Sequence, residues 1–300
     1  MPTRTRTTSG PRRRPAGGTP GHRPRKRFGQ HFLSPEWARK VVEAVAPQPG
    51  DVLLEIGPGT GALTRPLAET GVPMLAVEID RDLVAQLSRE MPPHVTLVSG
   101  DILRLDVVTY LSGLAPQRPP APDAASPRPR YRVVGNLPYN ISTTILMRLI
   151  DIDRRQRFFA DATVMVQREV ADRLLARPGS KAYGALTVSA AARTRMTRLL
   201  DLPPGAFVPR PKVHSAVIRL EFGLPTVRIA NDDVFDRLIR VLFSARRKTL
   251  ANALRRFDPS APAVLARTGL DPRRRPGTLQ VTEIVRLAEL FSSGERTPVL

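Results

Sequence analysis

The sequence predicts an α/β protein in which a parallel sheet carries helices on both faces and a small helical region follows. From Asp51 onward, short apolar stretches of strand length alternate with stretches of helical periodicity. After Phe222 only helical periodicity remains, with Arg and Lys between apolar residues at three- and four-residue spacing. The alternation that begins at Asp51 is typical of parallel sheets whose crossover connections are helices.

The predicted strands are short runs rich in Val, Leu and Ile, at 51–56, 74–79, 95–101, 131–136, 162–167 and 215–222. Helices are expected between the first strands, at 62–70 and 81–90, and again over 234–257. Pro and Ala dominate 112–130 without periodicity, which predicts a variable surface loop.

The length and composition predict two packed domains and a polyanionic partner. A chain of 300 residues with 41% hydrophobic content can bury one large core and one smaller core. We place the sheet domain at 25–222 and the helical domain at 223–300. The net charge of +20 favours a nucleic acid as the partner. The alternative is a solvated basic surface without such a partner, in a protein from an Arg-rich proteome. The motifs must decide between the two.

The first residues form a basic arm. Residues 1–27 contain nine Lys or Arg and no Asp or Glu, interleaved with Pro, Gly and Thr, so they cannot bury apolar area. We expect 1–24 to be a disordered arm that contacts phosphates. An organellar transit peptide is the alternative, although the many Pro and Gly residues disfavour the amphipathic helix of such signals.

The residue inventory excludes several classes of protein. Without cysteine the chain has no disulfides, no thiolate nucleophile and no Cys-bearing zinc site, which excludes a Cys-ligated zinc deaminase acting on adenine. No metal site is predicted. Apolar runs such as 74–77 are far shorter than the roughly 20 residues of a membrane span. We expect a soluble, cytoplasmic monomer.

A glycine turn after the first strand predicts a cofactor pocket. Gly57, Gly59 and Ala62 match the pattern G-x-G-x-x-A, in which glycines permit a tight bend and close approach of a ligand. Glu78 ends the second strand, where a carboxylate can accept hydrogen bonds from both hydroxyls of a ribose. A nicotinamide dinucleotide and S-adenosylmethionine both fit these residues, so both remain open at this point.

Asp101 follows the third strand at the edge of the sheet where open α/β folds bind ligands. Its carboxylate could accept a hydrogen bond from an adenine amino group. Both acids also have a structural alternative: Asp101 could cap the segment that follows it, and Glu78 could cap a helix together with Asp80.

The run Asn136-Leu137-Pro138-Tyr139 separates these interpretations. An exocyclic adenine amine is a poor nucleophile because its lone pair is delocalised into the ring. The Asn136 side-chain carbonyl and the Leu137 main-chain carbonyl can accept its two N–H bonds, and Pro138 stiffens the turn. Tyr139 can stack on the base, an interaction of roughly 1–3 kcal/mol. Positioning of this kind suits methyl transfer from a sulfonium, which needs no strong base beforehand.

The alternative for this run is an ordinary Asn-Pro turn with a half-buried tyrosine. That alternative loses weight because the run follows the glycine turn, Glu78 and Asp101 in sheet order. A dehydrogenase has no use for the motif.

The chain closely resembles the KsgA-type ribosomal RNA adenine dimethyltransferases from Arg25 through most of the C-terminal region. The matching segments are RKRFGQHFL at 25–33, EIGPGTGALT at 55–64, GNLPYNIST at 135–143, VQREVADRL at 166–174, SKAYGALTV at 180–188, FVPRPKVHSAVIRL at 207–220 and FSARRKTLANAL at 243–254. The arm before Arg25 and the Pro-rich loop are not part of the shared pattern.

The resemblance implies a Rossmann-like class I S-adenosylmethionine-dependent methyltransferase domain with a small helical domain. The implied activity is transfer of four methyl groups to two adjacent adenosines near the 3′ end of 16S-type RNA in the 30S particle. A role in late small-subunit assembly is implied as well.

Residue by residue, the resemblance implies that His31 and Leu33 line the cofactor pocket with Gly57, Gly59, Glu78, Asp101 and Asn136. It also implies that Phe207 faces Tyr139 across a flipped target base, since such a base must leave its stack to reach the methyl donor. Core packing is the alternative for Phe207. His31 stands where this family often has Asn, which leaves its role less defined.

A basic cluster resembles the RNA-facing helix of the family. It consists of Arg246, Arg247, Lys248, Arg255 and Arg256. Its alternative is a solvated helix face. Phosphate contacts would position the ribosomal particle, whereas the pocket for the flipped base would select adenine.

Two competing functions share the predicted fold. An Erm-type methylase would modify large-subunit RNA with the same chemistry; NLPYN and the 207–220 segment favour the small-subunit enzyme. A non-catalytic ribosome-assembly or transcription factor would keep the fold for binding alone. The presence of Asn136, Tyr139 and the cofactor acids disfavours it.

Overall fold

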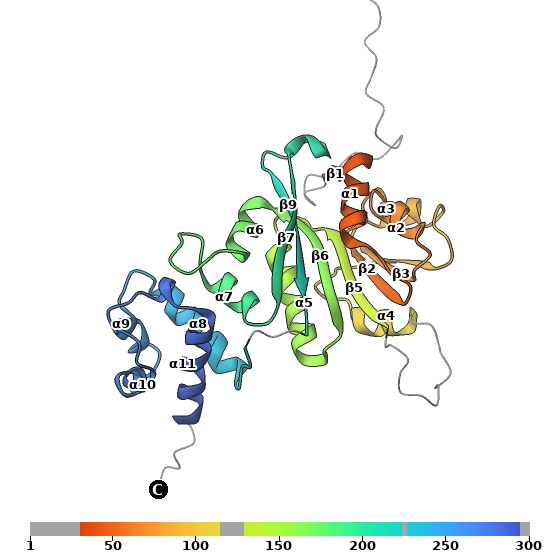
Figure 1. The fold of residues 1–300 in the computed structure, drawn as a ribbon. Coiled ribbons are helices and arrows are strands. Elements are labelled where there is room, and N and C mark those ends of the chain that lie inside the picture. The colour runs from red at the N-terminus through yellow and green to blue at the C-terminus, as the bar shows by residue number, and fades with distance from the viewer. Residues whose placement is uncertain (1–30, 115–128, 224–226, 295–300) are drawn as a thin grey trace, which may run out of the picture.

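A computed structural model describes residues 31–114, 129–223 and 227–294 of the protein (Figure 1). The basic arm expected at 1–24 lies outside the described residues, as do residues 115–128 of the Pro-rich segment. None of the helices in the described residues is both long and apolar enough to cross a membrane.

A seven-stranded sheet forms the centre of the molecule, in the order β4-β3-β2-β5-β6-β9-β7. The strands are β2 (Asp51–Ile56), β3 (Met74–Glu78), β4 (Val95–Ser99), β5 (Arg130–Asn136), β6 (Phe159–Gln167), β7 (Arg195–Leu202) and β9 (Ser215–Glu221). Each strand expected from the sequence is present within a few residues of its predicted position.

The sheet is mixed, because one strand runs against the parallel strands that the sequence predicted. Strands β4 to β6 are parallel, but β9 pairs antiparallel with both β6 and β7. Only residues 203–214 join β7 to β9, and they contain no α-helix. A parallel pair needs a crossover of a dozen or more residues that is usually helical, so this connection returns the chain in the opposite direction. Strand β7 was not predicted, because its position at the edge leaves most of its side chains partly exposed.

Helices cover both faces of the sheet, as predicted (Figure 1). Residues of β2 alternate between the two cores: Val52, Leu54 and Ile56 face one core and Leu53 the other. The first core holds α4 (Val107–Leu114), α5 (Ser142–Gln156), α6 (Arg168–Leu174) and part of α7 (Ala185–Ala191). The second holds α1 (Pro35–Val45) and α2 (Thr64–Ala68), and α3 (Arg81–Leu87) buries Leu83 and Leu87.

The N-terminal segment 31–45 is bound to the sheet domain at both of its ends. At the start, β1 (Phe32–Leu33) pairs antiparallel with β8 (Phe207–Val208), which follows a 3-10 turn, η2 (Pro204–Ala206). Helix α1 then begins with proline at its first turn, where the missing N–H has no cost, and buries Ala38, Val41 and Val45. The segment therefore reaches the edge of the pocket described below.

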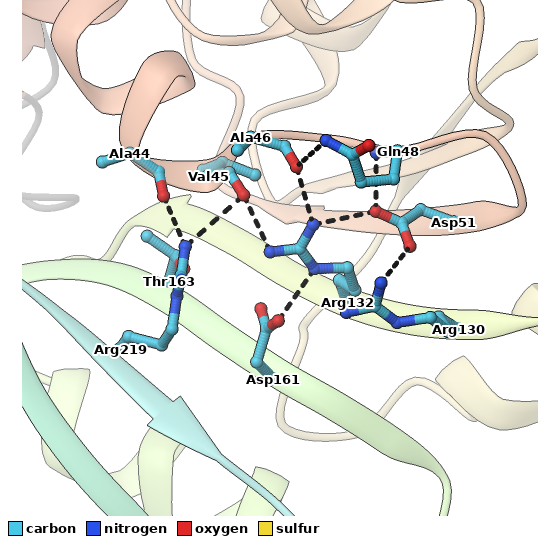
Figure 2. A network of polar contacts seen from close by, with 10 residues as sticks. All are labelled: Ala44, Val45, Ala46, Gln48, Asp51, Arg130, Arg132, Asp161, Thr163 and Arg219. Carbon is cyan, nitrogen blue, oxygen red and sulfur yellow. Dashed lines mark hydrogen bonds and ion pairs between the residues drawn. The ribbon is translucent and has the colours of Figure 1, made fainter.

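Two arginines, the buried Arg132 and the half-buried Arg219, hold the C-terminal end of α1 (Figure 2). Arg132 of β5 donates to the carbonyls of Val45 and Ala46 and to the carboxylates of Asp51 on β2 and Asp161 on β6, at 2.8–3.2 Å. Arg219 of β9 donates to the Ala44 carbonyl beside them. The guanidinium groups thus satisfy carbonyls that a helix terminus leaves without partners inside the helix.

The C-terminal helices form a second unit with its own core (Figure 1). They are α8 (Asp232–Ser244), α9 (Leu250–Leu254), α10 (Ala261–Thr268) and α11 (Val281–Gly294), with a 3-10 turn, η3 (Pro276–Thr278), before the last. The run 234–257, expected to be helical, is interrupted at 245–249, where Thr249 caps α9 through its hydroxyl.

Residues of the sheet domain complete this second core. Tyr183, Val188 and Ala192 pack into it, and the Tyr183 hydroxyl donates to the Leu279 carbonyl at 2.8 Å. Ala190 of the same helix α7 belongs to the core of the sheet. Helix α7 therefore serves both units, and the domain boundary at 222/223 stays a prediction.

We predict that Arg132→Met lowers the free energy of unfolding by about 3–5 kcal/mol, because it leaves the buried carboxylates of Asp51 and Asp161 unpaired. Urea unfolding measures the change. The matched control is Arg130→Met on the same strand, whose side chain is 54% exposed and 3.7 Å from Asp51. It should cost at most about 1 kcal/mol. Equal losses in the two variants would contradict the role assigned to Arg132.

Candidate active site

A pocket opens at the carboxyl ends of β2, β3 and β5 and beyond β4, under the segment 31–33. It is open to solvent at its mouth, and about 930 Å³ of space lies between its walls and in that mouth. Every residue that the sequence predicted for cofactor binding lines it: His31, Leu33, Gly57, Gly59, Glu78, Asp101 and Asn136. Leu137, Pro138 and Tyr139 line it too.

The glycine turn brings backbone close to the pocket. Gly57 and Gly59 have φ values of +70° and +58°, a region that side chains with a Cβ rarely adopt. A Cβ on Gly59 would lie 3.2 Å from the ring of Phe32. The turn can therefore hold this shape and pack under β1 only with glycine at position 59.

Glu78 holds the turn from the next strand. Its Oε2 accepts from the Gly59 N–H at 3.1 Å, and its Oε1 accepts from the Asp80 N–H at 3.0 Å. Burial raises the pKa of Glu78, and these backbone hydrogen bonds oppose the shift. Asp80, not Glu78, caps α3 by accepting from the Asp82 N–H, so the capping alternative for Glu78 does not apply.

Asp101 caps the segment that follows it and also lines the pocket, and its hydrogen bond to an adenine amino group stays a prediction. Its Oδ1 accepts from the Leu103 N–H at 2.9 Å, which caps the following turn, and the residue also lines the pocket. Its neighbour Ile102 and the corresponding residue after β3, Ile79, line the pocket as well. Ile79 is 51% exposed, an unusual exposure for a large apolar side chain. Sequence analysis missed both isoleucines, although each directly follows an acid at a strand end.

Glu55 was also missed. It lies on β2, lines the pocket and is fully buried, and burial raises its pKa to about 8. Among the described residues its Oε2 has no hydrogen-bond partner. A buried polar atom without a partner at a pocket wall is a feature that a polar ligand would satisfy.

The amide of Asn136 is oriented by the N-terminal segment. Its Nδ2 donates to the main-chain carbonyl of His31 at 2.8 Å. A carbonyl oxygen can only accept, so the NH₂ group must face His31 and the Oδ1 atom must point elsewhere. That the side-chain oxygen accepts from a ligand amine, the function predicted for it, stays a prediction.

Tyr139 is held by two other residues. Its hydroxyl shares a 2.6 Å hydrogen bond with the Ser215 hydroxyl. Its ring stacks on His31, with centroids 5.6 Å apart and an interplanar angle of 25°. The His31 ring donates from Nδ1 to the Pro209 carbonyl at 2.9 Å. Burial raises the pKa of Tyr139, so the phenol stays protonated at neutral pH.

Phe207 does not face Tyr139, which corrects the expectation of an aromatic sandwich. Its side chain is fully buried and packs in the core with Leu33, Met165 and Val217. The pairing of β8 with β1 places it opposite Leu33, and it is not among the pocket-lining residues in the described part of the chain. Core packing, the alternative for this residue, is the arrangement observed, and His31 is the ring that contacts Tyr139.

The basic cluster lies in the turn between α8 and α9 and after α9, not along one helix. Arg247, Lys248, Arg255 and Arg256 are exposed. Arg246 differs from them, because its Nη2 donates to the carbonyls of Ser180 and Lys181 at 3.1 and 2.7 Å. Arg246 thus joins the helical unit to the loop before α7.

Comparison with known families matches residues 21–293 to the family described as ribosomal RNA adenine dimethylase. The chain belongs to this family. Two dimethylase relatives carry the name ribosomal RNA small subunit methyltransferase A. That of Aromatoleum aromaticum is 42% identical over 277 residues, 91% of this chain and 96% of the relative. The relative from Vibrio cholerae is 37% identical over 284 residues, which make up 92% of this chain and 97% of the relative.

Solved structures share the dimethylase fold. A dimethyladenosine transferase from Plasmodium falciparum superposes with a TM-score of 0.69 at 22% identity, covering 88% of this chain and 98% of that one. The 23S rRNA methyltransferase ErmE superposes with a TM-score of 0.63 at 24% identity, covering 87% and 99%. These likenesses establish a class I methyltransferase fold, which both enzymes share.

Membership of the dimethylase family implies S-adenosylmethionine as the cofactor, and the pocket fits it. The glycine turn leaves backbone exposed to a ligand, Glu78 and Asp101 offer carboxylate oxygens, and Ile79 and Ile102 offer apolar surface. Glu55 adds a buried oxygen without a partner. These residues suit the amino, hydroxyl and adenine groups of such a molecule.

We predict that Glu55→Gln removes part of the pH dependence of stability. The folded protein keeps a proton on Glu55 up to about pH 8, whereas the unfolded chain loses it near pH 4.5. Stability therefore falls as pH rises between these values, by a few kcal/mol. Without cofactor, the Tm of Glu55→Gln should match wild type near pH 5 and exceed it near pH 8. A Tm difference that does not change with pH would contradict the raised pKa.

Proposed function

We propose that the chain dimethylates N6 of two adjacent adenosines near the 3′ end of small-subunit ribosomal RNA, in the 30S particle and late in its assembly. Family membership gives the reaction, adenine dimethylation of ribosomal RNA. The choice of the small subunit is supported by the names of relatives that cover nine-tenths of the chain. The observation that carries the mechanism is the bond from Asn136 Nδ2 to the His31 carbonyl.

The chain contributes positioning rather than acid–base chemistry. S-adenosylmethionine supplies an electrophilic methyl group when bound. Asn136 Oδ1, held in place by His31, and the Leu137 carbonyl accept the two N–H bonds of the adenine amine and draw it out of conjugation with the ring. Tyr139 stacks on the extruded base. Holding reactive groups in alignment can supply most of the rate enhancement in such a reaction.

Methylation of the large subunit is the second candidate, because ErmE has the same fold. Primer extension across both ribosomal RNAs, in cells with and without the gene, separates the two. We expect loss of the paired dimethyladenosines in the small-subunit RNA only. Loss confined to the large-subunit RNA would refute the proposal.

We predict that Asn136→Ala lowers methyl transfer to undermethylated 30S particles by at least about 100-fold, the usual cost of losing one oriented group at the reacting centre. RNA affinity should change by less than about twofold, because phosphate contacts supply most of it. The matched control is Asn140→Ala, an exposed asparagine of the same turn, which should transfer at the wild-type rate. Wild-type turnover in Asn136→Ala would disprove the role of this residue.

We also propose that Arg247, Lys248, Arg255 and Arg256 bind RNA phosphates. Arg247→Gln with Lys248→Gln should weaken RNA binding and reduce the slope of log affinity against log salt by about 0.7–0.9 for each phosphate that is no longer neutralised. The rate from the bound complex should stay unchanged. Arg246→Gln should in addition lower the Tm, because it loses its bonds to the Ser180 and Lys181 carbonyls. An unchanged salt slope in the double variant would contradict the proposed surface.

A further inference from the structure

The ring of Tyr139 is anchored both at its tip and on its face. The Ser215 hydroxyl binds the tip at 2.6 Å, and the His31 ring packs on the face. The Pro209 carbonyl holds His31 in turn, through a 2.9 Å hydrogen bond from Nδ1. Ser215 and Pro209 belong to one stretch of chain, 207–215, so a single segment supplies both supports.

The two contacts restrict different motions. The phenol oxygen lies on the axis about which the ring turns, so a bond to it fixes the position of the tip but leaves the ring free to rotate. Rotation about that axis is soft for tyrosine. The face contact with His31 limits this rotation. Together the contacts define the plane on which a base can stack.

Ser215 is a rigid support. It is completely buried and is the first residue of β9, where it pairs with Gln167 of β6 on one side and Leu202 of β7 on the other. Because the strand is paired on both sides, the backbone at 215 cannot shift without breaking the sheet. The sheet therefore sets the place of the Tyr139 hydroxyl.

No residue of 207–215 is among the pocket-lining residues of the described chain. Phe207, the residue of this segment expected to contact the base, is buried in the core. This segment supports the pocket wall through the pairing of β8 with β1, and it supports Tyr139 directly from Ser215 and through His31 from Pro209.

We propose that Ser215 is a positioning residue for methyl transfer, which acts through the Tyr139 hydroxyl to place the stacked adenine with its amine at Asn136. His31, supported by the Pro209 carbonyl, is the second positioning residue of the same ring. The proposal rests on the base-stacking role proposed for Tyr139. It deepens that role by identifying what aligns the ring.

The consequence is a defect in rate and not in binding. Without the anchor, the ring and the base on it take up a range of positions, and misplacement of reacting groups by about 1 Å can cost 100-fold in rate. RNA affinity comes mainly from phosphate contacts and should be unchanged. Cofactor affinity should be unchanged as well, because Ser215 does not line the pocket.

The test is a double-mutant cycle on the single-turnover rate, with 30S particles and cofactor at saturation. The variants are Ser215→Ala, Tyr139→Phe and the two combined. Each single variant should transfer about tenfold more slowly, and the combined variant should be no slower than either one, since both remove the same hydrogen bond. If Ser215→Ala slows transfer in the Tyr139→Phe protein by the same factor as in the wild-type protein, Ser215 acts through the sheet and the proposal is overturned.

The control for loss of a buried hydroxyl is Thr194→Val, because Thr194 is 2% exposed and bonds only the Ala190 carbonyl among the described residues. It should transfer at the wild-type rate. Should Ser215→Ala fail to fold, Tyr139→Phe decides alone, since it leaves Ser215 and the sheet intact. A wild-type rate in Tyr139→Phe would overturn the proposal.

Tyr139→Ala separates this inference from the proposed function. We expect it to transfer more slowly than Tyr139→Phe, because it removes the stacking surface itself. If Tyr139→Ala is slow while Tyr139→Phe and Ser215→Ala are at the wild-type rate, only the positioning role fails. If Tyr139→Ala also transfers at the wild-type rate, the base-stacking role fails with it.

Discussion

The buried guanidinium of Arg132 is the interaction on which the pocket depends. It joins β2, β5 and β6 to the end of α1 through Asp51, Asp161 and two main-chain carbonyls (Figure 2). Arg219 and apolar packing also attach helix α1, and β1 and His31 directly precede it. Because His31 orients Asn136 and packs on Tyr139, fixing α1 also fixes one wall of the reaction site.

The pocket has apolar walls and contains buried acids, and burial disfavours the charged form of these acids. Burial raises the pKa of both Glu55 and Glu78, although the chain as a whole carries a net charge of +20. The positive residues are placed elsewhere, on surfaces such as that of Arg247 and Lys248. This separation suits an enzyme that binds a polyanion by its surface and selects one base in a pocket away from that surface.

The helical unit is joined to the sheet domain by shared packing and polar contacts. Helix α7 supplies side chains to both cores, Tyr183 binds the Leu279 carbonyl, and Arg246 binds the loop before α7. Asp232 of α8 pairs with both Arg154 and Arg193 of the sheet domain. A basic surface attached in this way keeps a defined position relative to the pocket. An RNA that contacts both the surface and the pocket would require such a fixed distance.

The sequence alone determined the succession of strands around the glycine turn, the acids at the strand ends and the place of Asn136 and Tyr139 after the fourth strand. These follow from local patterns, and parallel strands bring their carboxyl ends to one edge. Only the tertiary structure decided that His31 and not Phe207 contacts Tyr139, and that Ser215 holds its hydroxyl. Tyr139 and Ser215 are 76 residues apart along the chain, and His31 is 178 residues from Pro209, which holds its ring. A local pattern carries no information about contacts at that separation, because they depend on how β1, β8 and the antiparallel β9 pack together.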